Sequence, residues 1–387
     1  METDDNKIAL DIFRQSVQSF LKKEVLPFVD DWEKDERIPK DIYQKMGEMG
    51  LLGLDKPIAY GGLALEFTYS KIFCEELGKI PCGGFSIATA VIAYMSASYI
   101  NSHGSAFLKE QFLSPTISGH YISSIAITEP SGGSDVQNIK TTATKHESHY
   151  EVNGSKTFIT NGVYGDYMVV AVKTPTAHHA DALSLLVIQQ QMKGVKVKKI
   201  KKLGWHASDT AEVFFDQVQI PKSHLIGEEG MGFSYLMEGL CTERLIGSIL
   251  GISSAQAALD YALEYMDQRE AFGKKLNKFQ VLRHRIADIV CEIEINRIYV
   301  DYCCSLKQNE ADLTLETAIA KLKCSETALK TIDQCLQFFG GYGYTEDFKI
   351  ARMYRDARVG TIGGGTSEIM LEIISKIHLS KKPTVTI

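Results

Sequence analysis

The sequence predicts an α+β protein with a helical N-terminal domain, a central antiparallel β-domain and a C-terminal domain resembling a four-helix bundle. Apolar residues recur at helical spacing up to about residue 118, and short alternating runs follow to about residue 221. Long helical segments then begin near residue 231. We therefore expect domains at residues 1–118, 119–230 and 231–387.

The N-terminal segments show the helical period most clearly. Phe13, Val17, Phe20 and Leu21 are spaced as on one helix face, and residues 42–52 and 67–77 share this pattern. The uncharged segment 80–102 contains two glycines and many Ser, Thr and Tyr residues, which favours a buried helix over a membrane span.

The middle of the chain alternates apolar and polar residues. Runs at 167–172, 183–188, 195–200 and 213–220 are separated by Gly, Asn, Pro or charged turns, which predicts antiparallel strands. Valines alternate with lysines over residues 193–202, which is typical of a solvated edge strand. Long helices are then expected at residues 233–267, 280–307 and 315–339, with a last one near 366–377.

Composition restricts the functional classes. The hydrophobic content of 44% and charged content of 23% are those of a soluble globular protein, and the net charge of −6 does not favour nucleic-acid binding. Eight cysteines without a CxxC pair indicate reduced thiols.

The acidic N-terminus lacks a signal or transit pattern, so we expect a prokaryotic cytoplasmic protein, or a mitochondrial matrix protein whose presequence has been removed. His178-His179 has no second ligand cluster, so no metal site is expected.

One stretch carries the strongest functional signal. Residues 121–128 read as a buried strand, and Pro130 with Ser131-Gly132-Gly133-Ser134 ends it in a turn without Cβ bulk. Such a turn can lie flat against a planar or phosphorylated ligand, although an ordinary surface turn has the same composition. There is no G-x-G-x-x-G motif after a strand and no P-loop, so any dinucleotide must bind by another route.

Three further strings follow in order. Residues 158–162 read FITNG, residues 269–273 read REAFG and precede Phe279-Gln280, and residues 337–356 read QFFGGYGYTEDFKIARMYRD. Together with TEPSGGSD at 128–135, they resemble the signatures of the acyl-CoA dehydrogenase family, over a length from about Ile8 to the C-terminal helix. The resemblance implies the fold of that family, with FAD as cofactor.

The resemblance also assigns cofactor contacts. It implies that the Thr160 hydroxyl bonds flavin N5, that Phe158 covers one ring face where Trp is commoner, and that Arg269 pairs with the pyrophosphate of a neighbouring subunit's FAD. The expected FAD-binding residues are Ile125, Ile127, Thr128, Gly133, Ser134, Phe158, Ile159, Thr160, Arg269, Phe272, Phe279, Gln280, Gln337, Phe338, Gly340, Gly341, Thr366 and Glu368.

The implied reaction removes an α proton and a β hydride from an acyl-CoA thioester. Most family members carry the catalytic base as a Glu in the C-terminal loop, but here Gly364 occupies that position. Glu243 is the alternative base. At helical spacing its neighbours are apolar or small residues, including Leu240 and Ile246, so we expect desolvation to raise its pKa. An ion pair with another helix is the competing explanation. Glu243-Arg244 resembles the base position of long-chain and isovaleryl-type members. Glu368 is a second candidate base.

The expected substrate contacts are Ser134, Leu240, Arg244, Gly364 and Gly365. By resemblance, residues 87–98 and 236–240 line the acyl pocket, although the same apolar residues would suit plain core. Gly363 replaces a commonly bulky aromatic residue, which leaves room for either a branched or a long chain.

The expected role is in fatty acid metabolism, including β-oxidation. The resemblance implies an acyl-CoA substrate, an electron-transfer flavoprotein as acceptor and a homodimer or homotetramer, without nucleic acid, metal or membrane span. The alternatives are an oxidase, a desaturase of carrier-bound acyl groups, or a non-catalytic assembly protein with the same fold.

Overall fold

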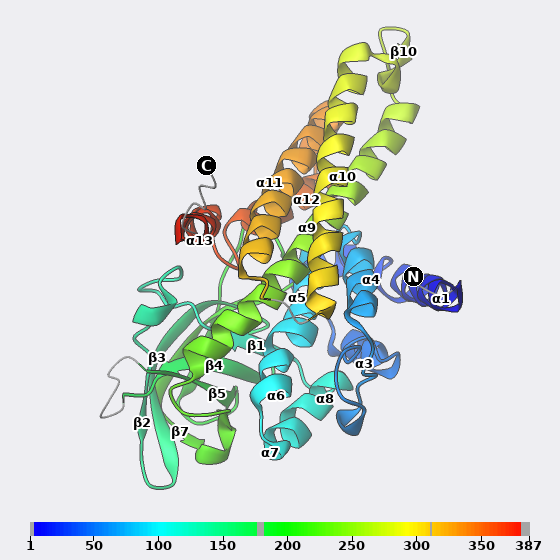
Figure 1. Ribbon diagram of the computed structural model, residues 1–387. Coiled ribbons are helices and arrows are strands. Elements are labelled where there is room, and N and C mark those ends of the chain that lie inside the picture. The colour runs from blue at the N-terminus through cyan, green and yellow to red at the C-terminus, as the bar shows by residue number, and fades with distance from the viewer. Residues whose placement is uncertain (1–3, 176–181, 310–311, 381–387) are drawn as a thin grey trace, which may run out of the picture. The chain divides into compact units, whose positions relative to one another are not determined.

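The computed structural model describes residues 4–175, 182–309 and 312–380. By their contacts these residues form two units (Figure 1). The first comprises Met1–Ser70 and Gly84–Thr242, and the second comprises Lys71–Gly83 and Glu243–Ile387. The three-domain division expected from the sequence remains a prediction. The pair His178-His179 lies outside the described residues.

Helices make up the N-terminal part of the chain, as expected. They are α1 (Asp4–Phe20), η1 (Leu21–Val25), α2 (Val29–Asp35), α3 (Lys40–Glu48), η2 (Ile58–Tyr60), α4 (Phe67–Gly78), α5 (Gly83–Ala90), η3 (Val91–Ser96), α6 (Ala97–His103), α7 (Ala106–Leu108), η4 (Lys109–Leu113) and α8 (Ser114–Ile117). The run Gly83–His103 has the length and composition of a membrane span, but most of it is buried, as in the core helix that the sequence predicts. Its middle third, η3, is a π-helix, a distortion frequent at functional sites.

The first unit also contains one eight-stranded sheet with the order β6-β7-β3-β2-β4-β5-β8 and with β1 beside β4. Its strands are β1 (Ser123–Ala126), β2 (Thr142–Lys145), β3 (His149–Thr160), β4 (Tyr167–Lys173), β5 (Leu183–Gln189), β6 (Val195–Lys199), β7 (Thr210–Pro221) and β8 (Leu225–Ile226). Most pairs are antiparallel, as expected. However, β1 runs parallel to β4 from Ser123↔Tyr167 to Ala126↔Val170, and β2 meets β4 in parallel at Thr142↔Lys173. The β2–β3 hairpin intervenes between β1 and β4 in sequence and provides the crossover that parallel pairing needs.

The central strands β4 and β5 are buried on both faces. Tyr167, Val169 and Ala171 of β4 pack into a core with α6 and α8, whereas the alternate residues Met168 and Val170 pack against β3 and β7. Successive side chains of a strand point to opposite faces. One continuous apolar strand can therefore serve two hydrophobic cores, which explains why β4 and β5 lack polar alternation.

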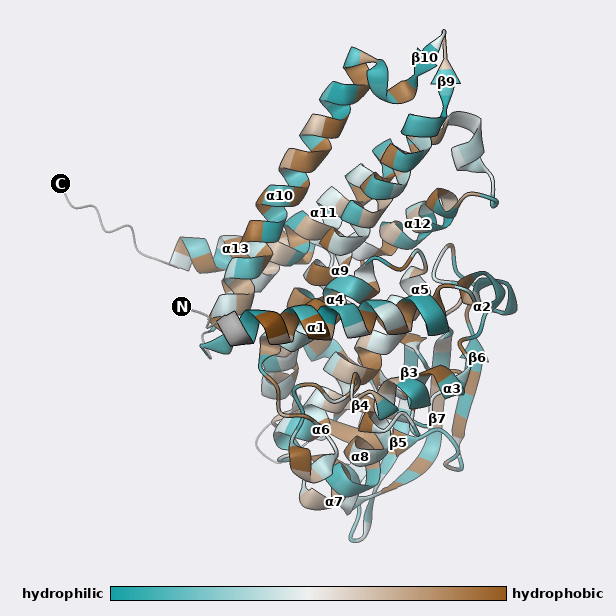
Figure 2. Cartoon of the chain, turned by 90° about the vertical axis from the view of Figure 1, so that its right-hand side faces the viewer, coloured by the Kyte–Doolittle hydropathy of each residue, from teal (hydrophilic) through white to brown (hydrophobic). Residues whose placement is uncertain are grey.

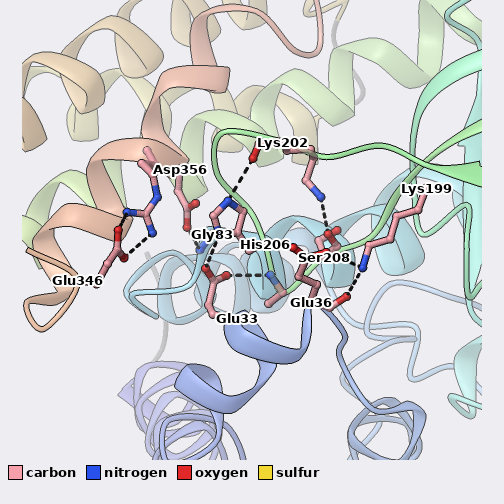
Figure 3. Close-up of polar contacts among 11 residues, drawn as sticks. Glu33, Glu36, Gly83, Lys199, Lys202, His206, Ser208, Glu346 and Asp356 are labelled. Atoms are coloured by element: carbon pink, nitrogen blue, oxygen red, sulfur yellow. Dashed lines mark hydrogen bonds and ion pairs between the residues drawn. The ribbon is translucent and has the colours of Figure 1, made fainter.

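The second unit is helical. It contains most of α9 (Gly232–Gln268), the hairpin β9 (Glu270–Ala271) and β10 (Lys274–Lys275), η7 (Leu276–Lys278), α10 (Gln280–Gln308), α11 (Thr314–Phe339), η8 (Gly340–Tyr344), α12 (Lys349–Ala357), η9 (Arg358–Thr361) and α13 (Ser367–Ser380). The three long helices and the last helix confirm the expected segments, and α12 is an additional helix. Asn296 of α10 donates to Thr327 of α11 at 3.1 Å, and Asp356 accepts the Gly83 N–H at 2.9 Å (Figure 3).

All eight cysteines lie in the described part of the chain, and none of them forms a disulfide bond there. Six of them are buried, Cys241 is half-buried and Cys291 is exposed. Burial raises the pKa of Cys303, Cys304, Cys324 and Cys335 to about 12, so these thiols stay protonated and inert.

Candidate active site

The structure brings the TEPSGGSD turn and the FITNG string together in the first unit. The Thr157 N–H donates to the Thr128 carbonyl at 2.9 Å. The ammonium of Lys156 is fully buried and donates to the Ile127 carbonyl at 2.9 Å and to the Glu129 carboxylate at 2.8 Å. Three contacts therefore join two segments that the sequence implicates in cofactor binding.

Glu129 is the centre of this junction. Its carboxylate also accepts the backbone N–H groups of Lys140 at 2.5 Å and Thr141 at 2.9 Å. Burial opposes ionisation, but the hydrogen bonds from Lys156 and Thr141 outweigh it and lower the pKa of Glu129 to about 2. The glycine turn therefore begins beside an ionised carboxylate that accepts hydrogen bonds from Lys140, Thr141 and Lys156.

Phe158 departs from the regular strand. The β3–β7 register shifts between Lys156 and Ile159, and within this bulge Phe158 takes a φ of +62° and leaves its side chain 66% exposed. A bulky side chain in the left-handed region is strained, and a bulge re-aims the bulged residue. Ile159 is buried and Thr160 is half-buried, while Gly133 and Ser134 in the other string are exposed.

The loop before β7 is fixed to the end of the FITNG string. The Asp209 carboxylate accepts the Val163 N–H at 2.5 Å, and the Asp209 carbonyl accepts the Asn161 N–H at 3.2 Å. Burial raises the pKa of Asp209, although the Val163 hydrogen bond opposes it. Trp205, at the turn of this loop, has a φ of +54°.

A carboxylate on α2 holds the same loop (Figure 3). Glu33 accepts the Ala207 N–H at 2.9 Å and lies 3.9 Å from His206 Nδ1, while Lys202 Nζ donates to the Ser208 carbonyl at 2.6 Å. No local pattern in the sequence marks this loop, because its contacts with Glu33 join residues more than 170 positions apart.

Two helices of the first unit pack closely where the acyl pocket is expected. The Tyr99 hydroxyl of α6 would lie 2.3 Å from a Cβ placed on Gly239 of α9, so only glycine fits there. Leu236 of α9 is fully buried in the same core as Tyr99 and Ile100, and Leu240 is half-buried. Residues 87–98, which include η3, and residues 236–240 therefore belong to neighbouring helices.

In the second unit, Glu243 and Arg244 are buried in α9, with 9% and 7% of their surface exposed. Arg244 Nη2 lies 4.0 Å from the position of a Cβ on Gly365, so its guanidinium is beside the glycine loop that lacks a carboxylate. Gly363 and Gly364 are exposed, and Gly364 has a φ of +67° with open space around a Cβ.

Thr366 and Glu368 form the N-terminus of α13. The Thr366 hydroxyl oxygen accepts the Ile369 N–H at 3.3 Å, which is a helix N-cap. The backbone N–H of Glu368 and the hydroxyl of Thr366 lower the pKa of the exposed Glu368 carboxyl. A solvated carboxylate of lowered pKa is a poor general base, which favours Glu243.

The second unit also has an open pocket of about 610 Å³. Five expected cofactor residues line it, namely Arg269, Gln337, Phe338, Gly340 and Gly341. The Arg269 guanidinium lies 5.8 Å from the centre of the Tyr342 ring, and Arg285 adds a second cation. Arginines beside aromatic rings and a glycine pair suit a ligand that carries phosphates and a purine.

The remaining expected residues lie beside this pocket in sequence. Phe272 is 96% exposed at the tip of the β9–β10 hairpin, where it and Gly273 take φ values of +50° and +76°. Its ring centre is 6.4 Å from that of the half-buried Phe279, and Gln280 is exposed. Two successive residues of positive φ are typical of a type I′ turn.

In the first unit, a glycine turn and an outward-facing aromatic ring suit the ring system of a flavin, and in the second unit the pocket with Arg269 and Arg285 suits the phosphates of a dinucleotide. A buried carboxylate, Glu243, whose neighbour in sequence Arg244 lies beside the carboxylate-free loop, is compatible with proton abstraction in a dry site. These features define the class as a flavin-dependent oxidoreductase.

Comparison with known proteins gives the family. The chain matches the acyl-CoA dehydrogenase N-terminal domain at residues 9–120, the middle domain at 124–218 and the C-terminal domain at 230–379. It therefore belongs to the acyl-CoA dehydrogenase family, flavoprotein oxidoreductases of fatty acid metabolism, and the resemblance inferred from its motifs is confirmed.

Several relatives are similar over nearly the whole chain. The long-chain specific acyl-CoA dehydrogenase of Rattus norvegicus mitochondria is 38% identical over 371 residues, which cover 95% of this chain and 85% of that protein. The short-chain specific acyl-CoA dehydrogenase of Clostridium acetobutylicum is 35% identical, with coverages of 94% and 96%. The crystal structure of acyl-CoA dehydrogenase from Geobacillus kaustophilus has a TM-score of 0.92 and 39% identity, covering 96% of this chain and 98% of its own, which confirms the fold.

Among the buried lysines, Lys156 and Lys321 lie at the candidate site but belong to none of the sequence motifs. Each interrupts an otherwise apolar or small-residue face, Lys156 in β3 and Lys321 among the alanines of α11. A lysine at a buried position of a helix or strand needs a polar partner, so its presence in an apolar pattern is the signal by which the sequence could have indicated such a contact.

Proposed function

We propose that this protein uses FAD to convert an acyl-CoA thioester to its α,β-unsaturated form, with Glu243 as the base that takes the α proton. Bound FAD supplies the acceptor for the β hydride at its N5 atom. Thr128, Ser134, Phe158 and Thr160 are proposed to hold the flavin ring.

The observations that support this proposal are that Glu243 is buried and that its neighbour in sequence, Arg244, lies beside the glycine loop. Because Gly364 has no side chain, the proton must go elsewhere, and Glu243 is the carboxylate next to the arginine that approaches Gly365. The loop still offers backbone N–H groups, which are proposed to polarise the thioester carbonyl and to stabilise the developing enolate. Arg244 is proposed to orient Glu243 or the thioester.

The test replaces the base and then supplies a new one. Glu243→Gln is expected to retain bound flavin but to slow its anaerobic bleaching by acyl-CoA by at least about 100-fold, because the proton acceptor is lost. Gly364→Glu in that background is expected to restore part of the rate, since a side chain there has open space despite the φ of +67°. Glu264→Gln is the matched control, because Glu264 is an exposed carboxylate on the same helix and lies outside the proposed acyl pocket. A Glu243→Gln variant as fast as Glu264→Gln would refute the assignment of Glu243 as the base.

The acyl chain is proposed to lie between residues 87–98 and 236–240. Gly363 is compatible with a branched or a long chain, so a panel of straight and branched acyl-CoAs, followed by flavin absorbance, would identify the substrate. An electron-transfer flavoprotein is the proposed acceptor. Peroxide formed at the rate of flavin reoxidation in air would favour an oxidase instead.

We also propose self-association into a dimer or tetramer. Large apolar side chains are exposed along α10, including Val281, Ile295, Ile298 and Tyr302, and apolar segments recur along this helix in Figure 2. Sedimentation of the purified protein would test this, and a monomer would oppose cofactor sharing between subunits. Related proteins occur in bacteria and in mitochondria, and we propose the cytoplasm or the mitochondrial matrix for this protein.

A further inference from the structure

A buried lysine lies beneath the glycine loop of the second unit. Lys321 of α11 has 6% of its surface exposed, and its ammonium donates a hydrogen bond to the Gly365 carbonyl, 44 residues further along the chain. Lysine is almost never buried without a partner, since desolvation of its charge is costly. The loop carbonyl is therefore a specific acceptor for Lys321.

The loop needs such a contact because of its composition. The loop contains three successive glycines, 363–365, and glycine has more backbone freedom than any other residue. Gly364 and Gly365 both take positive φ values, +67° and +99°. At one end, Val359 accepts the Ile362 and Gly363 N–H groups at 2.9 and 2.8 Å. At the other end, Thr366 caps α13. Lys321 holds the backbone between these two anchors.

From this geometry we propose that Lys321 is a positioning residue for the reaction, holding the loop so that its backbone N–H groups face the thioester carbonyl. This inference rests on the proposed function. A donor fixed before the reaction stabilises the enolate-like transition state without reorganisation, whereas a mobile loop must first be ordered. Loss of Lys321 should therefore lower the maximal rate of flavin reduction more than it weakens substrate binding.

The charges around Lys321 add a pH dependence. The charged groups that act on the Lys321 ammonium are Arg244 from α9, Glu326 from α11 and Glu368 from α13. Burial, followed by the nearby Arg244, lowers the pKa of Lys321 to about 8. A hydrogen bond from an ammonium is about twice as strong as one from a neutral donor. The hydrogen bond from Lys321 to Gly365 is therefore at full strength well below pH 8 and weakens as the pH rises through that value.

The test compares Lys321→Met, Lys321→Arg and the control Lys330→Met, an exposed lysine on the same helix. Anaerobic stopped-flow measurements would follow flavin reduction against acyl-CoA concentration and pH. Lys321→Met is expected to slow the limiting rate of flavin reduction by about 10- to 100-fold, with less than about a 3-fold change in substrate affinity. In this variant the rate should no longer fall as the pH rises through about 8. Lys321→Arg is expected to keep a rate within about 5-fold of the unmodified protein and to move the decline to higher pH, because arginine stays charged.

Lys321→Met with the same rate and pH profile as Lys330→Met would overturn the inference while leaving the proposed function intact. If Lys321→Met does not fold, Lys321→Arg decides, and an unchanged alkaline decline in that variant would overturn the inference. A protein whose flavin no acyl-CoA reduces would overturn the proposed function and this inference together.

Discussion

Replacing Lys156 with methionine tests the junction of the two cofactor segments most directly. The change keeps the length of the side chain but removes its charge and its hydrogen bonds to Glu129 and Ile127. The Glu129 carboxylate, with 3% of its side chain exposed, then remains buried without its cationic partner. Breaking a buried pair in this way is strongly destabilising, because one charge stays uncompensated.

The magnitude follows from removing one partner of a buried pair. The pKa of Glu129 falls from the usual 4.5 to about 2, which favours folding, whereas burial lowers the pKa of Lys156 to about 8, which opposes it, so the two shifts largely offset each other while the pair is intact. Measured losses from breaking buried pairs are about 3–5 kcal/mol. For a chain of 387 residues, Lys156→Met is therefore expected to lower Tm by about 4–6 °C.

The assay is thermal unfolding monitored by circular dichroism together with flavin fluorescence, which reports release of the cofactor. Lys145→Met is the matched control, because Lys145 pairs with Glu229 at 2.8 Å but has 54% of its side chain exposed. This exposed pair is worth less than about 1 kcal/mol. Equal Tm values for the two variants would refute the argument that Glu129 depends on Lys156.

The stability that the Glu129 carboxylate contributes depends on pH in a definite direction. A carboxyl group whose pKa is lowered on folding stabilises the protein above its unfolded pKa, near 4.5, and this contribution is lost as the pH falls through about 2. The stability difference between the protein and a Glu129→Gln variant should therefore narrow as the pH falls below 4.5.

Two further predictions concern backbone and packing. Phe158→Gly relieves the strain of a φ of +62° and should raise the stability of the apoprotein by about 1 kcal/mol while weakening flavin binding, so a lower Tm of the apoprotein would contradict the strain argument. Gly239→Ala places a Cβ 2.3 Å from the Tyr99 hydroxyl and should cost about 1–3 kcal/mol, measured by urea unfolding. In a Tyr99→Leu background, which lacks the three side-chain atoms that lie 2.3–2.6 Å from this Cβ, the cost of Gly239→Ala should be smaller, and an equal cost would show that another contact causes it.

The sequence predicts the regular parts of the fold because their signals are local. The helical period over residues 315–339 is repeated in every turn, and α11 spans Thr314–Phe339. The parallel alignment of β1 with β4 and the bulge at Phe158 are not local, since each depends on a partner strand more than 40 residues away in sequence. Strand pairing of that kind leaves no periodic trace in either segment.

For the site, the sequence by itself determined which chemistry is available: a glycine at position 364 and a carboxylate at 243 are matters of composition and order. Only the tertiary structure decided which side chains fix the carboxylate and the loop in place. The hydrogen bonds from Lys156 to Glu129 and from Lys321 to Gly365 join residues 27 and 44 positions apart. A lysine in an apolar segment signals that a partner is needed, but the burial that makes the partner necessary exists only once the chain has folded.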